Sequence, residues 1–319
     1  MMKLLLLKCL YAPLNLPLSD AIKIQYMRIV RRILMLFTAP INIALPIGIE
    51  MPLVGREFIH RHLMFYKIWE PSLSLYIYDN LESNDLFCDV GANIGYFSCL
   101  AARKLEKLGS KGHVLAVEAS PSIFAKLKSN TASMKNIYTK QLAAGDVDGE
   151  VEIFKSTENN EGLSSIYENQ NESGMVLEAV VKMKTLTQMI AEQNLPVPRL
   201  VKIDVEGAEW PVIKGMEALL QDQTNALEVI VEFDEVRLKQ FGISAEEFFT
   251  YFENFGFHSY DLNNLYLTPE YLPQTKISGP TVYDRKTRKQ TDILFSRRNK
   301  KQIYEGHRSV TVKDFLNTL

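Results

Sequence analysis

A loop between residues 89 and 95 has residue types suited to holding a charged ligand. It reads Asp89-Val90-Gly91-Ala92-Asn93-Ile94-Gly95 and continues an apolar run that starts at Leu86. Glycines let a backbone turn sharply and approach a ligand closely. Apolar residues at helical spacing, beginning with Phe97 and Leu100, follow at once, and a helix start presents free N–H groups and a positive dipole end. The segment therefore predicts a strand, a tight loop and a helix start that can hold a carboxylate.

Two acidic residues extend this prediction. Asp89 opens the loop, where a carboxylate can accept hydrogen bonds from an ammonium group or organise the loop itself. Glu118 ends the strand-like run that begins at His113, and an acid in that place can accept hydrogen bonds from both hydroxyls of a ribose, as in dinucleotide enzymes. The loop and Glu118 together predict a nucleotide-like ligand.

Further carboxylates follow two later strand-like runs. Asp204 and Glu206 come after Leu200–Ile203, and Glu232 and Asp234 lie at the end of the next run. Ligands of open α/β sheets bind at the carboxyl ends of the strands, and residues two apart share a face if the strand continues that far. Asp204, Glu206 and Glu232 are therefore candidate catalytic residues. The alternative is that some of these acids cap the following helices.

The chemistry that these acids suit is proton removal. A carboxylate with a raised pKa could take the proton of a hydroxyl group. His258 is another candidate base, although its apolar strand pattern favours a histidine of the core. Paired carboxylates could instead hold Mg²⁺ and polarise a hydroxyl group. Neither a histidine nor a ligand-spacing rule supports that alternative, so we assign no metal.

The elements that must position these residues alternate between short apolar runs and helical patterns. This alternation predicts an α/β fold with a mainly parallel sheet that helices cover on both faces. The expected strands are residues 86–90, 113–118, 137–144, 200–204, 228–233, 257–262 and 292–296. Residues 145–198 interrupt the alternation with strand-like runs at 151–154 and 177–183. The polar loop 156–174 and the segment 263–281 are expected to face the substrate, since loops on a rigid scaffold carry specificity.

The first fifty residues contain an uncharged stretch, Ile33–Ile49, that follows three arginines. It is about the minimum length for a membrane span, and Pro40 and Pro46 interrupt it. The pattern favours a helix and a strand that pack on the domain. A peripheral contact with the inner face of a membrane remains the alternative.

The charge and cysteine content narrow the function classes. A formal net charge of −2 over 319 residues argues against a nucleic-acid partner, because such proteins usually carry a basic excess. The basic stretch Arg285–Lys301 is interpreted as a solvated face, with a surface for anionic lipid or phosphate as the alternative. The three cysteines form no CxxC pair, so neither a disulfide framework nor a zinc site is predicted. A reducing compartment, the cytoplasm, is expected.

Five segments in order resemble the FkbM family of class I methyltransferases. The resemblance runs from about Trp69 to Ser296. It is carried by Trp69-Glu70-Pro71, by Asp89–Gly95 with Ser98, by Glu118-Ala119-Ser120-Pro121, by Ala143-Ala144-Gly145-Asp146 with Gly149, and by Val201-Lys202-Ile203-Asp204-Val205-Glu206-Gly207-Ala208-Glu209. The last segment is the most specific to the family.

The resemblance implies a Rossmann-like domain over residues 69–300, between an N-terminal extension (1–68) and a C-terminal tail (301–319). Its sheet would be seven-stranded and mostly parallel, with an antiparallel last strand. The resemblance also implies S-adenosylmethionine as the cofactor and a small-molecule or glycan acceptor, usually methylated on a hydroxyl of a sugar or natural product. The cofactor-binding residues that it implies are Glu70, Asp89, Gly91, Asn93, Gly95, Ser98, Glu118, Ala144 and Asp204.

Two other functions remain open at this point. An NAD(P)-dependent oxidoreductase would use the fingerprint G-x-G-x-x-G, but Asn93 stands where its second glycine belongs and Ser98 does not supply the third. A non-catalytic, membrane-associated scaffold with a vestigial methyltransferase fold would explain the apolar N-terminus. The intact loop and acids argue against such decay.

Overall fold

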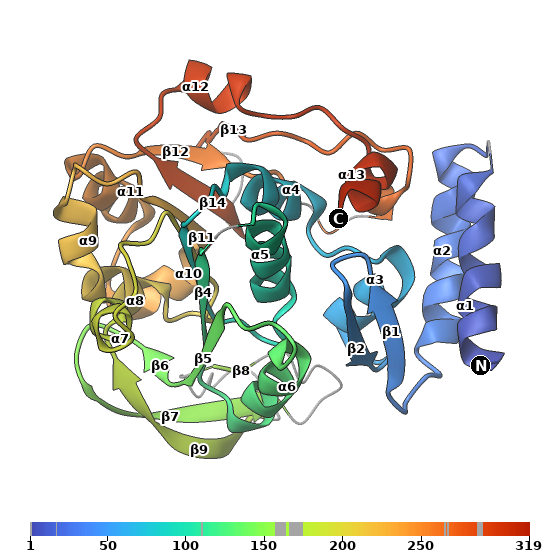
Figure 1. Cartoon of the computed structure of the whole chain (residues 1–319), viewed down its shortest axis with the longest axis horizontal. Coiled ribbons are helices and arrows are strands. Elements are labelled where there is room, and N and C mark those ends of the chain that lie inside the picture. Colours follow the sequence, from blue (N-terminus) through green and yellow to red (C-terminus); the bar gives the residue numbers. More distant parts are fainter. Residues whose placement is uncertain are drawn as a thin grey trace.

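The structure is a computed structural model that describes residues 2–16, 18–109, 111–156, 164–165, 175–264, 266, 268–285 and 290–319. A central sheet has the strand order β13-β12-β14-β11-β10-β3-β4-β5 (Figure 1). Its strands are β3 (Leu86–Val90), β4 (His113–Glu118), β5 (Ile137–Gln141), β10 (Leu200–Ile203), β11 (Glu228–Asp234), β12 (His258–Asp261), β13 (Thr281–Val282) and β14 (Gln290–Ser296).

The directions of the strands confirm the predicted α/β sheet. Strands β5, β4, β3, β10 and β11 run parallel, and β14 pairs antiparallel with both β11 and β12. The sheet has eight strands instead of the expected seven, because the two-residue strand β13 pairs with the edge of β12. The single strand expected at 137–144 is two strands, since the chain leaves this sheet after Gln141.

A second, four-stranded sheet fills the interruption in the βα alternation. It consists of β6 (Ala143–Ala144), β7 (Gly149–Ser156), β8 (Ser164–Ser165) and β9 (Met175–Lys184) in the order β6-β9-β7-β8. The strand-like runs at 151–154 and 177–183 are confirmed as parts of β7 and β9. Most of the loop 156–174 lies outside the described residues.

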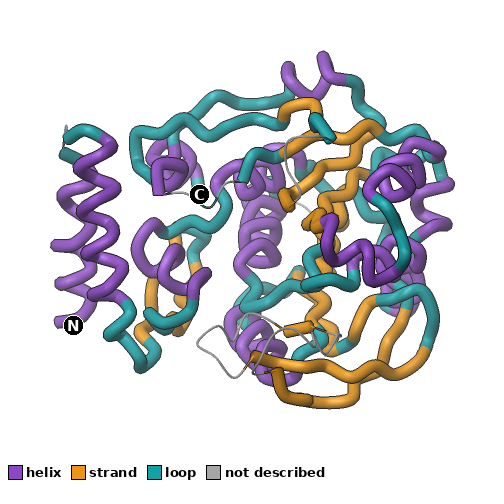
Figure 2. Tube along the Cα trace, turned by 180° about the vertical axis from the view of Figure 1, so that it is seen from behind, coloured by secondary structure: helices purple, strands orange, loops and turns teal. Residues whose placement is uncertain are grey.

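Helices flank the central sheet on both sides (Figure 2). Leu86, Cys88 and Val90 point to one side, into a core shared with α7, α8, α9 and α11. Phe87 points to the other side, into a core shared with α4, α5 and α13. These helices are α4 (Pro71–Asn80), α5 (Tyr96–Lys107), α6 (Pro121–Thr131), α7 (Leu186–Glu192), α8 (Glu209–Gly215), α9 (Glu217–Gln221), α10 (Glu235–Leu238), α11 (Ala245–Asn254), α12 (Lys300–Glu305) and α13 (Val312–Thr318), with the 3-10 turns η2 (Lys239–Phe241) and η3 (Thr268–Tyr271). Because side chains alternate along a strand, Asp89 faces the α4–α5 side, as Phe87 does.

The N-terminal segment packs on the α4–α5 side of the molecule. It contains α1 (Met2–Tyr11), η1 (Ala12–Asn15), α2 (Asp20–Leu34), the hairpin β1 (Ile41–Leu45) and β2 (Ile49–Leu53), and α3 (Phe58–Tyr66). The expected helix and strand are thus present, and Met27, Val30 and Leu34 of α2 join the core. The uncharged stretch is divided between the end of α2 and the hairpin. Within the described ranges, no helix is long and apolar enough to cross a membrane.

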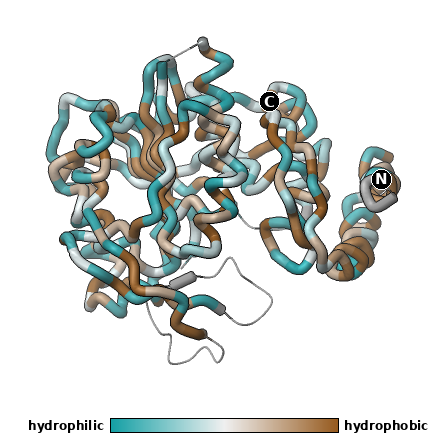
Figure 3. The backbone as a smooth tube through the Cα atoms, turned by 60° about the horizontal axis from the view of Figure 1, so that its bottom comes forward, coloured by the Kyte–Doolittle hydropathy of each residue, from teal (hydrophilic) through white to brown (hydrophobic). Residues whose placement is uncertain are grey.

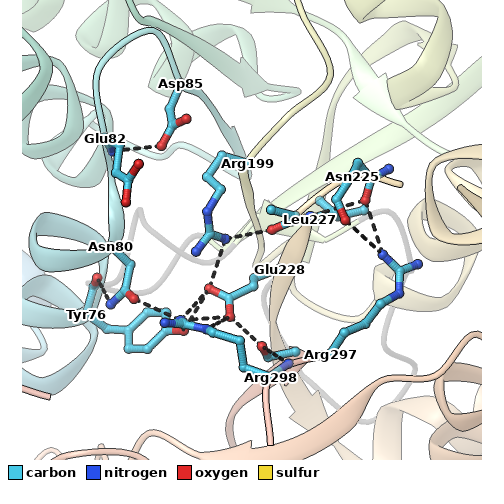
Figure 4. Close-up of polar contacts among 12 residues, drawn as sticks. Tyr76, Asn80, Glu82, Asp85, Arg199, Asn225, Leu227, Glu228, Arg297 and Arg298 are labelled. Carbon is cyan, nitrogen blue, oxygen red and sulfur yellow. Dashed lines mark hydrogen bonds and ion pairs between the residues drawn. The ribbon is translucent and has the colours of Figure 1, made fainter. Parts of the chain in front are cut away.

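A buried carboxylate holds the sheet together at the end opposite the strand carboxyl termini. Glu228, at the start of β11, is 2% exposed. It accepts hydrogen bonds from Tyr76 Oη (2.8 Å), Arg199 Nη1 (3.0 Å) and Arg298 Nε (2.8 Å) (Figure 4). Burial alone would raise the pKa of Glu228, but the charges of Arg199 and Arg298 override it and lower the pKa. Glu228 therefore stays ionised and joins three distant elements.

The basic stretch Arg285–Lys301 was expected to form a solvated face, and this expectation is wrong for two of its arginines. Arg298 binds Glu228, and Arg297 donates to the carbonyls of Leu220 (2.6 Å) and Phe255 (3.1 Å). Both side chains therefore serve packing at the end of β14. Residues 286–289 of the same stretch lie outside the described residues.

Replacing Glu228 with alanine should lower the free energy of unfolding by about 3–5 kcal/mol, because Arg199 and Arg298 lose their buried partner. Urea unfolding at pH 7 measures this change. Since the pKa of Glu228 is lowered on folding, its contribution is present above about pH 4.5 and is lost as the pH falls further. Glu217→Ala, at an exposed ion pair with Lys214, is the control and should change stability by less than about 1 kcal/mol. Equal effects of the two substitutions would contradict the prediction.

Candidate functional site

A pocket opens at the carboxyl ends of β3, β4 and β10. It is lined by Trp69, Gly91, Asn93, Glu118, Ala144, Asp204 and Glu206, with apolar side chains that include Phe97, Ile123, Leu142 and Ile153. Of the cofactor-binding residues expected from the sequence, Gly91, Asn93, Glu118, Ala144 and Asp204 line this pocket. Glu70, Asp89, Gly95 and Ser98 are not among the described residues that line it.

The glycine loop has the tight turn that its sequence predicts. Gly91, Asn93 and Gly95 have φ angles of 79°, 49° and 89°, in the left-handed region that glycine and asparagine tolerate best. The amides of Gly91 and Ala92 both donate to the Val117 carbonyl at 2.9 Å. The loop is thereby held against the end of β4, and α5 begins directly after Gly95.

Alanine at position 91 should disrupt this arrangement. Its Cβ would lie 1.7 Å from the Asp204 carbonyl oxygen, so the β3 and β10 loops would have to separate. Strained φ and overpacking together predict a loss of about 3 kcal/mol in the free energy of unfolding. Gly256→Ala is the matched control, because Gly256 has a φ of +81° and nothing lies within 4 Å of an added Cβ. Chemical denaturation of both variants tests this; a loss at Gly91 no larger than at Gly256 would refute it.

Glu118 joins the loop to the end of β4. Its Oε2 accepts from the Asn93 amide (3.0 Å) and its Oε1 from the Ser120 amide (2.9 Å). Burial raises the pKa of Glu118 to about 7, although these two hydrogen bonds oppose the shift. The carboxylate thus faces the pocket with each oxygen oriented by the backbone.

Beside the loop, two buried acids each keep one oxygen without a hydrogen-bond partner among the described residues. Asp89 Oδ2 accepts from Ser98 Oγ at 2.6 Å, whereas Asp89 Oδ1 has no partner in the described part of the chain. Glu70 precedes α4 with a φ of 42°, and none of the described residues is a partner of its Oε2 either. Burial raises the pKa of both carboxyl groups, that of Glu70 well above its usual value. These oxygens can accept hydrogen bonds from a positively charged group.

A lysine lies among these acids. Lys202 is 2% exposed, and the register of β10 against β3 places it directly beside Asp89. Its Nζ is 2.8 Å from Asp204 Oδ2 and 5.1 Å from the centre of the Phe97 ring. Burial would lower the pKa of Lys202, but the charges of Asp204, Asp89 and Glu70 raise it. Lys202 is therefore a permanent cation at the base of the pocket.

The three candidate catalytic acids lie close together. Carboxylate oxygens of Asp204, Glu206 and Glu232 lie within 4.8 Å of one another. Arg237 bridges two of them, with Nη2 2.6 Å from Glu206 Oε2 and Nη1 3.2 Å from Glu232 Oε2. Of the three, Asp204 and Glu206 line the pocket.

The ionisation of these acids differs because their surroundings differ. Burial would raise the pKa of Asp204, but Lys202 overrides it and lowers the pKa. Burial raises the pKa of Glu206 to about 7, with Arg237 opposing. Burial and the charges of Asp204 and Glu206 raise the pKa of Glu232 well above its usual value. Asp204 is thus held ionised, whereas the pKa values of Glu206 and Glu232 are raised.

The other acid and base candidates from the sequence are Asp234 and His258, and neither lies among the three clustered acids. Asp234 caps α10, accepting from the amides of Val236 (2.7 Å) and Arg237 (3.3 Å), as the capping alternative foresaw. Strand β10 ends at Ile203, so the strand periodicity does not reach Glu206, which has a φ of 54°. His258 is exposed at the start of β12, so the expectation of a core histidine is wrong.

Four polar residues of the site are absent from the sequence-based candidates. They are Lys202, Arg237, Tyr266 and Asp292, of which Asp292 lies opposite Glu232 in β14 and accepts from Asn264 Nδ2 at 2.6 Å. A lysine inside the apolar run Leu200–Ile203 was a signal that could have been used. The other three have no local signal, because distant segments bring them to the site.

The buried acids predict how stability depends on pH without ligand. Folding raises the pKa of Glu118 and Glu206 to about 7 and that of Asp292 to about 6, so the folded state binds more protons than the unfolded state above about pH 4.5. The free energy of unfolding should therefore fall as the pH rises from 5 to 7.5. Urea unfolding at several pH values checks this sign; stability that rises throughout would contradict it.

Comparison with known proteins places this pocket in a family. The model of the methyltransferase FkbM domain matches residues 89–259, more than half of the chain. Hexuronic acid methyltransferase AglP of Haloferax volcanii is 26% identical over 148 residues, covering 45% of this chain and 54% of AglP. Methyltransferase sdnD of Sordaria araneosa is 28% identical over 166 residues, covering 43% of this chain and 62% of sdnD. The chain thus spans about half the length of AglP and less than two thirds of sdnD.

Among solved structures, this chain is similar to a methyltransferase FkbM. The crystal structure of methyltransferase FkbM from Methylobacillus flagellatus KT matches 75% of this chain and 52% of that chain, with 12% identity and a TM-score of 0.39. The fold assignment rests on the sheet topology. The domain match itself contains the glycine loop, Glu118 and the Asp204–Glu209 segment. The chain therefore belongs to the FkbM methyltransferase family, whose cofactor is S-adenosylmethionine.

Proposed function

We propose that this protein transfers a methyl group from S-adenosylmethionine to a hydroxyl group of a sugar, glycan or natural product. One observation carries the proposal: the pocket that Glu118 and the glycine loop form continues directly to Asp204 and Glu206. A nucleoside-binding end and an acidic end suited to proton removal thus share one cavity.

The residues of the pocket fit the proposed donor. The ribose hydroxyls would be bound by Glu118, and the adenine would lie among Ile123, Leu142 and Ala144. The carboxylate of the methionine end suits the loop and the start of α5. Its ammonium group is the kind of donor that Asp89 Oδ1 and Glu70 Oε2 lack.

The donor, when bound, supplies a methyl group on a positively charged sulfur, and the protein must align the acceptor for in-line attack. Glu206 is the proposed base, because it lines the pocket and has a pKa of about 7. Arg237 orients Glu206 through their ion pair. Lys202 keeps Asp204 ionised, and this negative charge favours the donor, whose sulfur is positively charged, over the product, whose sulfur is neutral.

No metal is part of this proposal. The oxygens of Asp204, Glu206 and Glu232 are close enough to hold an ion. However, Lys202 contacts the first of these acids, and Arg237 contacts the other two. These cations already supply positive charge where Mg²⁺ would bind.

A sugar acceptor is favoured among the hydroxyl compounds. AglP is by name a methyltransferase of hexuronic acid, and the family resemblance implies hydroxyl groups of sugars as frequent acceptors. A panel of sugars and sugar acids, with release of S-adenosylhomocysteine as the readout, would test the acceptor class.

Calorimetry of the full chain with S-adenosylmethionine tests the donor. We expect one site per chain, and an absence of binding would sink the proposal. Thermal protection by a nicotinamide cofactor but not by S-adenosylhomocysteine would favour the oxidoreductase alternative. Donor binding without transfer to any acceptor in the panel would favour the non-catalytic scaffold.

We also propose a peripheral membrane contact for α1 and α2. Ile22 and Ile29 of α2, seven residues apart on one face, are 53% and 58% exposed, and Leu36 is 75% exposed. Figure 3 shows hydrophobic stretches in these helices at the edge of the molecule. Apolar residues beside arginines suit an anionic surface. Sedimentation with anionic liposomes should detect binding that Ile22→Ser with Ile29→Ser removes and Val236→Ser retains; no sedimentation of the wild type would end this proposal.

A further inference from the structure

A second pocket of about 410 Å³ lies between α2, α3 and the segment that carries Tyr266 and Pro269. Figure 1 shows α2 and α3 at the N-terminal side of the molecule. Among the described residues, the lining consists of apolar and aromatic side chains together with Arg28, Arg31 and Arg61, and it includes no aspartate or glutamate. The donor site already described makes no use of this pocket.

The arginines of this second pocket carry charge that the protein leaves available. Arg28 and Arg31 are exposed and form no ion pair with a carboxylate in the part of the chain that the structure describes. Arg61 is anchored, since its Nη1 donates to the carbonyls of Gly55 (3.1 Å) and Arg56. The charge of Glu57 attracts the Arg61 guanidinium group, whereas the charge of Arg31 repels that group. An anion in the pocket would relieve this repulsion.

The second pocket adjoins the first through one aromatic side chain. Trp69 lines the donor pocket, stacks on Tyr266 at 5.5 Å and contacts the rings of Phe58 and His62 at 5.7 and 5.1 Å. Those three residues line the second pocket. Helix α3 also faces both, since Ile59 lines the donor pocket. A molecule seated in the second pocket would therefore lie beside the site of methyl transfer.

The second pocket and the acidic end of the donor pocket have opposite charge. Asp204 and Glu206 at that end would repel an anionic group of the acceptor, whereas guanidinium groups match the geometry of carboxylate and phosphate. We infer that the second pocket is the acceptor subsite, where Arg28, Arg31 and Arg61 bind a carboxylate or phosphate of the acceptor while the aromatic wall holds its ring. The acceptor's hydroxyl then points past Trp69 toward Glu206. This inference rests on the proposed function and adds an acidic substrate class to it.

Fluorescence of Trp69 in a Trp210→Phe background provides a binding assay, since the chain has two tryptophans. The probes are p-nitrophenyl β-glucoside, its glucuronide and its 6-phosphate, which differ only at carbon 6. We expect a charged probe to bind at least 10-fold more tightly than the glucoside. Arg31→Gln should remove about 10-fold of that preference, the effect of one charged hydrogen bond. Arg32→Gln, the neighbouring exposed arginine outside the pocket, should leave it unchanged.

The outcomes separate this inference from the proposed function. Preference for the glucuronide or for the phosphate, lost in Arg31→Gln, supports the subsite and identifies its anion. Equal binding of all three probes, or equal effects of Arg31→Gln and Arg32→Gln, overturns it. Loss of binding to anionic vesicles in Arg31→Gln, without any binding of the probes, overturns it in favour of a lipid surface. In every case calorimetry with S-adenosylmethionine tests the donor site independently, because none of these arginines lines that pocket.

Discussion

Replacing Glu118 with glutamine should weaken the binding of S-adenosylmethionine by about 100-fold. The reason is that glutamine lacks the charge and one of the two acceptor oxygens, so one hydrogen bond from the ribose hydroxyls is lost and the other no longer goes to a charged group; a hydrogen bond to a charged group is worth about 1.5 kcal/mol or more. Because burial raises the pKa of Glu118 to about 7, the wild type should bind the donor more tightly at pH 8 than at pH 6. The variant should lack this part of the pH dependence. Isothermal calorimetry at both pH values measures these quantities.

Glu178→Gln is the matched control for this substitution. Glu178 accepts hydrogen bonds from Ser120 Oγ (2.7 Å) and the Ser122 amide (3.2 Å), immediately beside Glu118, but it does not line the donor pocket. Its substitution should change donor affinity by less than about 3-fold. Wild-type affinity in Glu118→Gln would rule out a ribose-binding role for this acid.

Replacing Glu206 with glutamine should lower kcat by about 100-fold or more, the usual contribution of a general base. The wild-type kcat should rise with pH through about 7, since burial raises the pKa of Glu206 to that value and only the ionised form can take a proton. The variant should lose this rise but keep its affinity for S-adenosylmethionine. Release of S-adenosylhomocysteine with p-nitrophenyl β-glucuronide as the acceptor gives the pH profile.

Glu235→Gln is the control for a general effect of removing an acid near Arg237. Glu235 lies on the same helix as Arg237 but pairs with Lys239. Because Glu206, Glu232 and Asp204 interact closely, the inflection belongs to the group as a whole. The variants assign it: if Glu232→Gln removes the inflection and Glu206→Gln keeps it, Glu206 is not the base.

Several features of the site could be predicted from local sequence alone. The conformation of the loop Asp89–Gly95 follows from its own residue types, because its two glycines and Asn93 tolerate positive φ angles. Glu118 ends a strand whose apolar run is continuous in the sequence. The parallel direction of the central strands follows from the βα alternation, since parallel strands need crossover helices. Errors arose where the signal was short, as at strand 137–144 and the two-residue β13.

The protonation states of the acids in the site could not be predicted from local sequence. A carboxylate's protonation depends on which charges lie within a few ångströms, and strand register decides that. Lys202 reaches Asp89 through the pairing of β10 with β3, and Asp292 lies opposite Glu232 through the pairing of β14 with β11. Arg237 bridges Glu206 and Glu232 from a separate helix. None of these distances has a counterpart in sequence spacing.

The sequence by itself therefore determined the family, the glycine loop and the acids at the strand ends, because each is a local pattern of turn residues, periodicity and chemistry. Only the tertiary structure decided which acid is held ionised and which acids have a raised pKa. It also decided that Arg31 and Arg61, from separate helices, line one pocket beside Trp69. The physical reason is that electrostatic and packing interactions act through space, between elements whose separation along the chain carries no information about their contact.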